Sequence, residues 1–212
     1  MADYTLYCFA QSGNAYKVAL MLTLVGAKWS PIFVDFFKGE TRTPEYRTNV
    51  NEMGEVPVLV DGERKLSQSG AILNLLMERF GQFGPRGEHE RYEIWRWILF
   101  DNHKISNFLA TYRFMKTLAK IGDPIVHKYL NGRIKSNLKI LDKHFDASPF
   151  AVGSHPTIAD ISLCGYMLFP ADEYDFDIAS ENPAIGAWLD RLRALPKWQP
   201  PYDLMPDQAI AP

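Results

Sequence analysis

The side chains best suited to chemistry stand where predicted strands meet predicted helices. The apolar run at residues 58–60 predicts a buried strand, but Pro57 cannot donate to its ladder and belongs at the first residue or at a bulge. A cis Val56-Pro57 bond would turn the Val56 N–H and C=O toward solvent to bind an extended, peptide-like ligand; a trans proline at a sheet edge is the alternative. Ser69 precedes the next helical pattern, where it either simply caps the helix or leaves N–H groups facing an anion.

A second group of candidates lies at the end of the first predicted strand. Tyr7, Cys8, Ser12 and Asn14 are the side chains with useful chemistry in this stretch. Alternation along the strand puts Cys8 on the same face as Leu6, which predicts a core side chain rather than a nucleophile. Ser12 follows the strand and precedes a helical pattern, so it either caps that helix or presents its hydroxyl to a ligand.

The elements predicted around these residues follow the order strand, helix, strand, then strand, strand, helix. Strands are predicted at residues 4–9, 29–36 and 58–60 and near Leu66, and helices from the Ser12 turn to Gly26 and from Ile72 onward. The turn signal Asp61-Gly62 joins the last two strands. A polar, irregular segment is expected at residues 38–51. This order predicts a βαβ-ββα unit that ends near Phe80.

The sequence after residue 80 changes character. Glycine and proline are concentrated in residues 81–89, which predicts a linker. Helices are then predicted at 90–119, 124–145 and 184–195, with another that begins at Thr157 and an extended tail at 197–212. Thr157 and Asp160 have the spacing of a capping box. The predicted fold class is therefore an α/β domain at residues 1–80 followed by an all-α domain at 90–212.

Composition limits the classes of protein to which the chain can belong. Its 212 residues, 47% of them hydrophobic, suffice for two domains, and a formal net charge of −2 argues against a nucleic-acid partner. No apolar run is long enough to span a membrane, and the first residues lack the pattern of a signal peptide. The two cysteines form neither a CxxC motif nor a zinc site. We therefore expect a cytoplasmic protein without a metal or a membrane partner.

Taken together, these motifs resemble the cytosolic glutathione S-transferase family. The Val56-Pro57 and Gln68-Ser69 pairs resemble its thioredoxin-like, glutathione-binding domain, and Ser12-Gly13-Asn14 resembles bacterial members of the serine type. The pattern Gly153-x-x-x-Thr157-x-Ala159-Asp160 resembles a folding motif of the family's helical domain. The resemblance covers nearly the whole chain. It implies a thioredoxin-like N-terminal domain, an all-helical C-terminal domain that contributes the second-substrate pocket, and a homodimer.

The resemblance also implies roles for the residues of the first two motifs. Ser12, with Asn14 as a second donor, would hydrogen-bond the sulfur of glutathione and favour its thiolate, which is the nucleophilic form of a thiol. The Val56 backbone, beside Pro57, would pair with the cysteinyl part of glutathione.

The ends of glutathione are where this sequence departs from the family pattern. Gln68 and Ser69 would hold the γ-glutamyl carboxylate, but Gln68 stands where many members carry glutamate and, as a neutral group, should bind the ligand's ammonium more weakly. Glu55 stands where lysine or glutamine is common and would repel the glycyl carboxylate. Lys38 is therefore the candidate cation for that group.

The implied reaction is the transfer of glutathione to a small hydrophobic electrophile, with reduction of disulfides or peroxides as a further activity. The alternative is a non-catalytic binding or regulatory module that kept the fold. Intact Ser12, Pro57, Gln68 and Ser69 favour the enzyme. Asp101 is an unusual charge among apolar positions of the first long helix, and we expect it either in a polar network near the subunit interface or in an ion pair with arginine or lysine.

Overall fold

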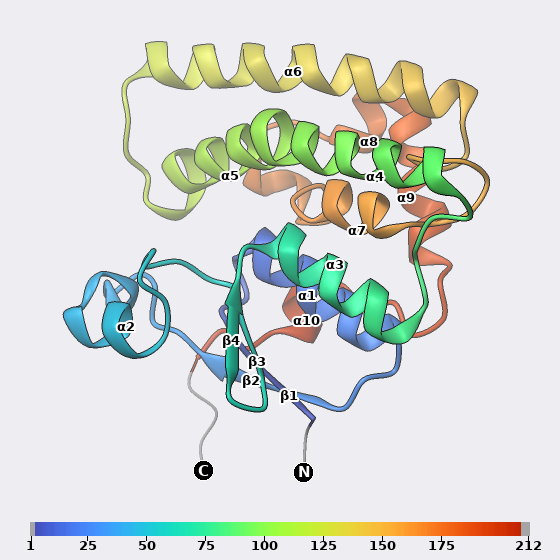
Figure 1. Ribbon diagram of the computed structural model, residues 1–212. Coiled ribbons are helices and arrows are strands. Elements are labelled where there is room, and N and C mark those ends of the chain that lie inside the picture. The colour runs from blue at the N-terminus through green and yellow to red at the C-terminus, as the bar shows by residue number, and fades with distance from the viewer. Residues whose placement is uncertain (1–2, 209–212) are drawn as a thin grey trace. The chain divides into compact units, whose positions relative to one another are not determined.

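The computed structural model describes residues 3–208, which form two compact units (Figure 1). The first unit comprises residues 3–82 together with 196–208, and the second comprises residues 83–195. The first is a sheet with helices and the second is built from helices. The predicted fold class, an α/β unit and a helical unit, is confirmed.

The C-terminal tail differs from the prediction, which gave residues 197–212 to the helical domain as an extended segment. Instead it contains a short helix, α10 (Pro201–Leu204), which packs against the first helix of the first unit. The Ala10 N–H also donates to the Pro206 carbonyl, with an N···O distance of 2.8 Å. These contacts fasten the tail to the sheet-containing unit. Residues 209–212 lie outside the described residues.

A four-stranded mixed sheet forms the centre of the first unit. Its strands are β1 (Tyr4–Cys8), β2 (Trp29–Phe33), β3 (Val58–Asp61) and β4 (Arg64–Ser67), in the spatial order β2-β1-β3-β4. β1 runs parallel to β2 and antiparallel to β3, and β4 returns antiparallel to β3. Gly62 turns the chain between β3 and β4 with a φ of 60°, as the Asp61-Gly62 signal predicts.

Two long helices pack on this sheet and against each other (Figure 1). They are α1 (Gly13–Leu24) and α3 (Ser69–Phe80). α1 stops before Gly26, whose φ of 73° is left-handed and ends the helix at the predicted glycine.

The segment predicted to be irregular, residues 38–51, contains helical structure. A 3₁₀ turn at Glu40–Arg42 precedes α2 (Pro44–Asn49). Thr43 caps α2 by accepting a hydrogen bond from the Tyr46 N–H at 3.1 Å, and proline suits the first helical position. The prediction was wrong here because a helix this short has no apolar periodicity to reveal it.

The second unit consists of helices and their connections. They are α4 (Glu88–Phe100), α5 (Asn107–Arg113), α6 (Pro124–Ala147), α7 (Ile158–Cys164), α8 (Ile178–Glu181) and α9 (Pro183–Arg193). The helix predicted at 90–119 is present but changes to π-helical geometry at Asp101–Ser106 and Phe114–Leu118. Within residues 3–208, no helix combines the length and apolar composition needed to cross a membrane.

Buried carboxylates connect the helices of this unit. Asp160 accepts hydrogen bonds from the backbone N–H groups of Ala151 (2.7 Å) and Thr157 (2.8 Å) and from Trp188 Nε1 (2.9 Å). The predicted capping box is therefore present, and it also links α7 to α9. Asp101 accepts from the hydroxyls of Ser106 (2.8 Å) and Ser162 (2.6 Å), which places it in a buried polar network.

Candidate functional site

The strand register brings most of the candidate residues to one end of the sheet. Tyr7 of β1 lies opposite Val58 of β3, and Val58 lies opposite Ser67 of β4. The chain segments that continue from these three residues are the turn from β1 into α1, the residue Pro57 before β3, and Gln68 after β4. The starts of α1 and α3 therefore lie at the same sheet end as the Val56-Pro57 bond.

Ser12 lies in the turn from β1 into α1 and is the N-cap of that helix. Its Oγ accepts a hydrogen bond from the Ala15 N–H at 3.1 Å, which satisfies one of the unpaired donors of the first helical turn. The side chain is buried, and its hydroxyl donates no hydrogen bond to any of residues 3–208. A hydroxyl has one donor and two acceptor positions. Ser12 can therefore cap the helix and still donate to a ligand.

Asn14 is the second residue of α1, two positions after Ser12. Its Oδ1 atom is buried and receives no hydrogen bond from any described residue. A buried acceptor without a donor lowers the stability of the fold by about 1–3 kcal/mol, so packing alone does not explain why it is there. The start of α1 thus carries a hydroxyl with an unused proton at Ser12 and, two residues further on, a buried amide oxygen without a donor at Asn14.

The Val56-Pro57 peptide bond is cis, which confirms the cis alternative. Two buried side chains hold the backbone that precedes it: the Tyr46 hydroxyl (3.1 Å) and Asn51 Nδ2 (2.9 Å) both donate to the Glu55 carbonyl. Burial raises the pKa of Tyr46 above its usual range, so its phenol remains a donor. Sequence reasoning missed both residues, because they lie in the segment predicted to be irregular.

Gln68 and Ser69 lie where β4 passes into α3. Ser69 was expected to cap this helix, but it is the first helical residue, and Gln68 takes the cap position without a side-chain bond to the helix. The reason is the backbone of Gln68, whose φ of 67° and ψ of 108° fall outside the helical region. Ser69 is buried, and its hydroxyl has no partner among the described residues.

The Gln68 amide points toward the loop before Val56. Its Nε2 donates to Glu55 Oε2 at 3.0 Å and lies 3.3 Å from Met53 Sδ. Glu55 was expected to face the glycyl end of the ligand, whereas its carboxylate is bonded to the residue expected at the γ-glutamyl end. No cation pairs with Glu55 among residues 3–208.

Lys38 lies in the loop after β2, and its side chain is 85% exposed. Its Nζ pairs with Asp35 Oδ2 at 2.9 Å, and hydrogen bonding by Lys38 holds the pKa of Asp35 below its usual range. Lys38 also lines a cavity of about 310 Å³ with Phe9 and Gln11, the residues that lead into the Ser12 turn. The structure therefore brings Lys38 to the turn but shares its charge with Asp35.

Cys8 is a core residue of the first unit. It is fully buried at the end of β1, and burial raises the pKa of its thiol to about 12. A thiol with a pKa raised this far stays largely protonated at neutral pH, which argues against Cys8 as the nucleophile. The prediction of a core cysteine is confirmed.

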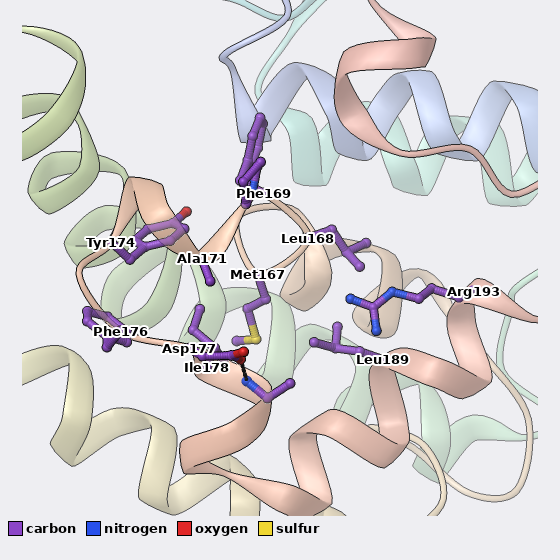
Figure 2. Close-up of a pocket in the computed structure, with 12 residues that line it drawn as sticks. Met167, Leu168, Phe169, Ala171, Tyr174, Phe176, Asp177, Ile178, Leu189 and Arg193 are labelled. Carbon is purple, nitrogen blue, oxygen red and sulfur yellow. Dashed lines mark hydrogen bonds between the residues drawn. The ribbon is translucent and has the colours of Figure 1, made fainter.

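A separate cavity of about 410 Å³ lies within the helical unit (Figure 2). Met167, Leu168 and Leu189 give it apolar lining, and Asp177 and Arg193 add charges. Figure 2 shows the Asp177 carboxylate bonded to a backbone N–H, that of Ala179 at 2.9 Å, because Asp177 caps α8. None of the residues predicted for the site lines this cavity. Among residues 3–208, no three His, Cys, Asp or Glu side chains gather to hold a metal ion.

Both units of the chain match known proteins of one family. The family description "Glutathione S-transferase, N-terminal domain" matches residues 2–78, and "Glutathione S-transferase, C-terminal domain" matches residues 113–191. The chain is 33% identical to a glutathione S-transferase of known structure from Pseudomonas fluorescens Pf-5, covering 94% of this chain and 99% of that one with a TM-score of 0.86.

Two further relatives add to this. A glutathione transferase family member from Pseudomonas fluorescens Pf-5, crystallised with two glutathione bound, is 25% identical, with 92% and 89% of the two chains covered and a TM-score of 0.78. A probable maleylacetoacetate isomerase from Vibrio cholerae is 28% identical over 92% of this chain and 94% of its own length. The four-stranded sheet, the helical unit and these matches together show that the chain belongs to the glutathione S-transferase family.

Proposed function

We propose that this chain is a glutathione transferase of the serine type, which binds glutathione at the end of its sheet and transfers the sulfur to an electrophile. The observation that carries the proposal is the unused hydroxyl proton of Ser12 at the start of α1. The glutathione bound by the Pseudomonas relative supports the choice of ligand.

Ser12 acts on the sulfur of bound glutathione. A free thiol with a pKa near 8.5 is mostly protonated at pH 7. A hydroxyl donor and the positive end of α1 both favour the thiolate and lower that pKa. Asn14 adds a second donor through its amide nitrogen, and the thiolate then attacks the electrophilic carbon while the leaving group departs with its electron pair.

The remaining candidates hold the rest of the tripeptide. The Val56 backbone beside Pro57 pairs with the cysteinyl unit, and Gln68 and Ser69 take the γ-glutamyl carboxylate. The first N–H groups of α3 lack helical partners and suit this anion. Lys38 takes the glycyl carboxylate, in exchange for its pair with Asp35.

The electrophile is expected against the helical unit, and reduction of small disulfides or peroxides by the same thiolate is a further activity. Trp97 and Tyr112, aromatic residues of the first long helix, are buried and belong to the core. The cavity of Figure 2, lined by Met167, Leu168 and Leu189 together with the charged Asp177 and Arg193, is the space in the helical unit that we propose for this compound. A cytoplasmic detoxification role is the setting we propose.

The chain is also proposed to form a homodimer. Tyr92 and Leu99 of α4 are 67% and 64% exposed and lie two helical turns apart, so they share one face. Exposed apolar side chains grouped in this way favour association. Sedimentation velocity at micromolar concentration should show a dimer, and Leu99→Lys should shift it toward monomer while Ile125→Lys on α6 should not.

The test of the proposed function is the titration of enzyme-bound glutathione, followed by its thiolate absorbance in the ultraviolet. We expect a bound thiol pKa at least one unit below that of free glutathione, together with turnover in a screen of electrophiles and small disulfides. Binding with an unchanged thiol pKa and no turnover would instead favour the non-catalytic module. No binding at all would remove the proposal.

A further inference from the structure

The ligand's free ammonium has no obvious counter-charge in the proposed site. Glutathione carries an α-ammonium on its γ-glutamyl group, and an ammonium offers three donors and a full positive charge. Gln68 can accept one of these hydrogen bonds but brings no charge. A carboxylate in the same place would add the attraction between opposite charges to the hydrogen bond.

Glu55, which is hydrogen-bonded to Gln68, can supply the missing negative charge. Gln68 Nε2 donates to Glu55 Oε2 at 3.0 Å, so the amide nitrogen is turned to Glu55 and the Gln68 Oε1 atom remains an acceptor. Glu55 is exposed and has no cation partner among the residues the structure describes. We propose that Glu55, paired with Gln68, is the counter-ion that holds the α-ammonium of glutathione, so that the acidic and amide roles of these two positions are exchanged in this chain.

The backbone around both residues supports a fixed arrangement. The Glu55 carbonyl is held by Tyr46 and Asn51, both buried, and Gly54 before it has a φ of 67°. A side chain at Gly54 would come within 2.8 Å of the Thr41 carbonyl oxygen, so the loop backbone next to Glu55 is closely packed.

Gln68 is held in an unusual conformation of its own. Its φ of 67° with ψ of 108° is a combination that costs a non-glycine residue about 1–3 kcal/mol, and such costs concentrate at ligand sites. A surface amide that only hydrogen-bonded a neighbour would gain too little from that contact to offset the cost. The pair is therefore built to present Gln68 Oε1 and the Glu55 carboxylate together.

The inference rests on the proposed function, and its test separates the two. Binding of glutathione and of its deamino analogue, glutaryl-cysteinylglycine, is measured by calorimetry for wild type, Glu55→Gln, and the exchanged variant Glu55→Gln with Gln68→Glu. Glu52→Gln is the matched control, since Glu52 is an exposed glutamate in the same loop. Thermal melts confirm that each variant is folded.

We expect Glu55→Gln to weaken glutathione binding by about tenfold to a hundredfold, the range of one hydrogen bond to a charged group. Binding of the deamino analogue should not change, and the exchanged variant should regain most of the lost affinity. Unchanged glutathione affinity in Glu55→Gln, equal weakening of both ligands, or no recovery in the exchanged variant would each overturn the inference. Wild type that binds neither ligand would overturn the proposed function instead.

Discussion

Two helix starts, one in each unit, use the same capping chemistry with different results. At α1, the Ser12 hydroxyl accepts one backbone N–H and keeps its own proton unused. At α7, Thr157 and Asp160 form a reciprocal capping box, and Asp160 additionally accepts from Ala151 and Trp188. Every oxygen of Asp160 is occupied by protein donors.

The difference separates a polar group that builds the fold from one that is held ready for a ligand. A fully satisfied buried carboxylate stabilises its surroundings, and removing it leaves several donors without acceptors. The Ser12 hydroxyl stabilises the fold only by capping α1, and its own proton can form a hydrogen bond only when a ligand is bound. Variants at the two helix starts should therefore affect different measurements.

The largest effect is expected for Asp160→Ala. The change leaves three buried N–H donors, those of Ala151, Thr157 and Trp188, without their acceptor, at about 1–3 kcal/mol each, so the free energy of unfolding should fall by at least about 3 kcal/mol. Urea denaturation followed by circular dichroism measures this. Asp190→Ala is the control, because its ion pair with Arg193 is exposed and worth at most about 1 kcal/mol. Equal losses in both variants would remove the distinction.

Ser12→Ala should affect the bound thiol more than it affects the stability of the fold. Loss of the cap costs about 1 kcal/mol of stability, while loss of a hydrogen bond to a charged sulfur costs about 1.5–3 kcal/mol. At about 1.36 kcal/mol per pKa unit, the bound thiol's pKa should rise by roughly one to two units. Affinity for glutathione should change less, because Val56, Gln68 and Ser69 still hold the peptide.

The control for Ser12→Ala is a helix cap in the other unit. Asp123 caps α6 by accepting the Ile125 N–H at 2.7 Å, so Asp123→Ala should lose similar stability without moving the thiol pKa. If both variants raised that pKa, the effect would come from weakened folding and not from the Ser12 hydroxyl.

Asn14→Ala should have a smaller effect on the bound thiol and should not lower the stability of the fold. The Asn14 Oδ1 is buried without a donor, so its removal should leave the free energy of unfolding unchanged or raise it by up to about 1 kcal/mol. The bound thiol's pKa should rise by less than in Ser12→Ala. A clear loss of stability would mean that Asn14 is part of the packing. A larger pKa rise than that of Ser12→Ala would give Asn14 the principal role.

The same comparison explains what the sequence could predict. The Thr157–Asp160 spacing, the Asp61-Gly62 turn and the Val56-Pro57 bond follow from local rules, because a cap, a turn or a proline acts within a few residues. The contact between Gln68 and Glu55 depends on a ladder and a packed loop from distant parts of the chain. Local spacing carries no signal for it.

The predictions for the C-terminal tail and for residues 38–51 were wrong for related reasons. α2 is too short to show a helical period. The tail was predicted to be an extended part of the helical domain, whereas the bond from the Ala10 N–H to the Pro206 carbonyl and the packing of α10 on α1 join it to the sheet-containing unit. Chain order alone does not decide which core receives a terminal segment.

The smallest effect on turnover is expected for Cys8→Ser, because the Cys8 thiol is buried and protonated near neutral pH. Its pKa is about 12 in the folded chain and near 8.5 when exposed by unfolding. Between these values the folded state keeps a proton that the unfolded state has lost. The Cys8 thiol should therefore lower the stability of the wild type by about 1.36 kcal/mol per pH unit as pH rises above 9.

Cys8→Ser has no thiol at this position and should not show this loss of stability. Urea denaturation at pH 8, 9 and 10 should therefore show a stability difference between wild type and variant that changes only at the alkaline end, with turnover at pH 7 nearly unchanged. Loss of activity in Cys8→Ser with normal unfolding would instead place Cys8, and not Ser12, at the reacting sulfur.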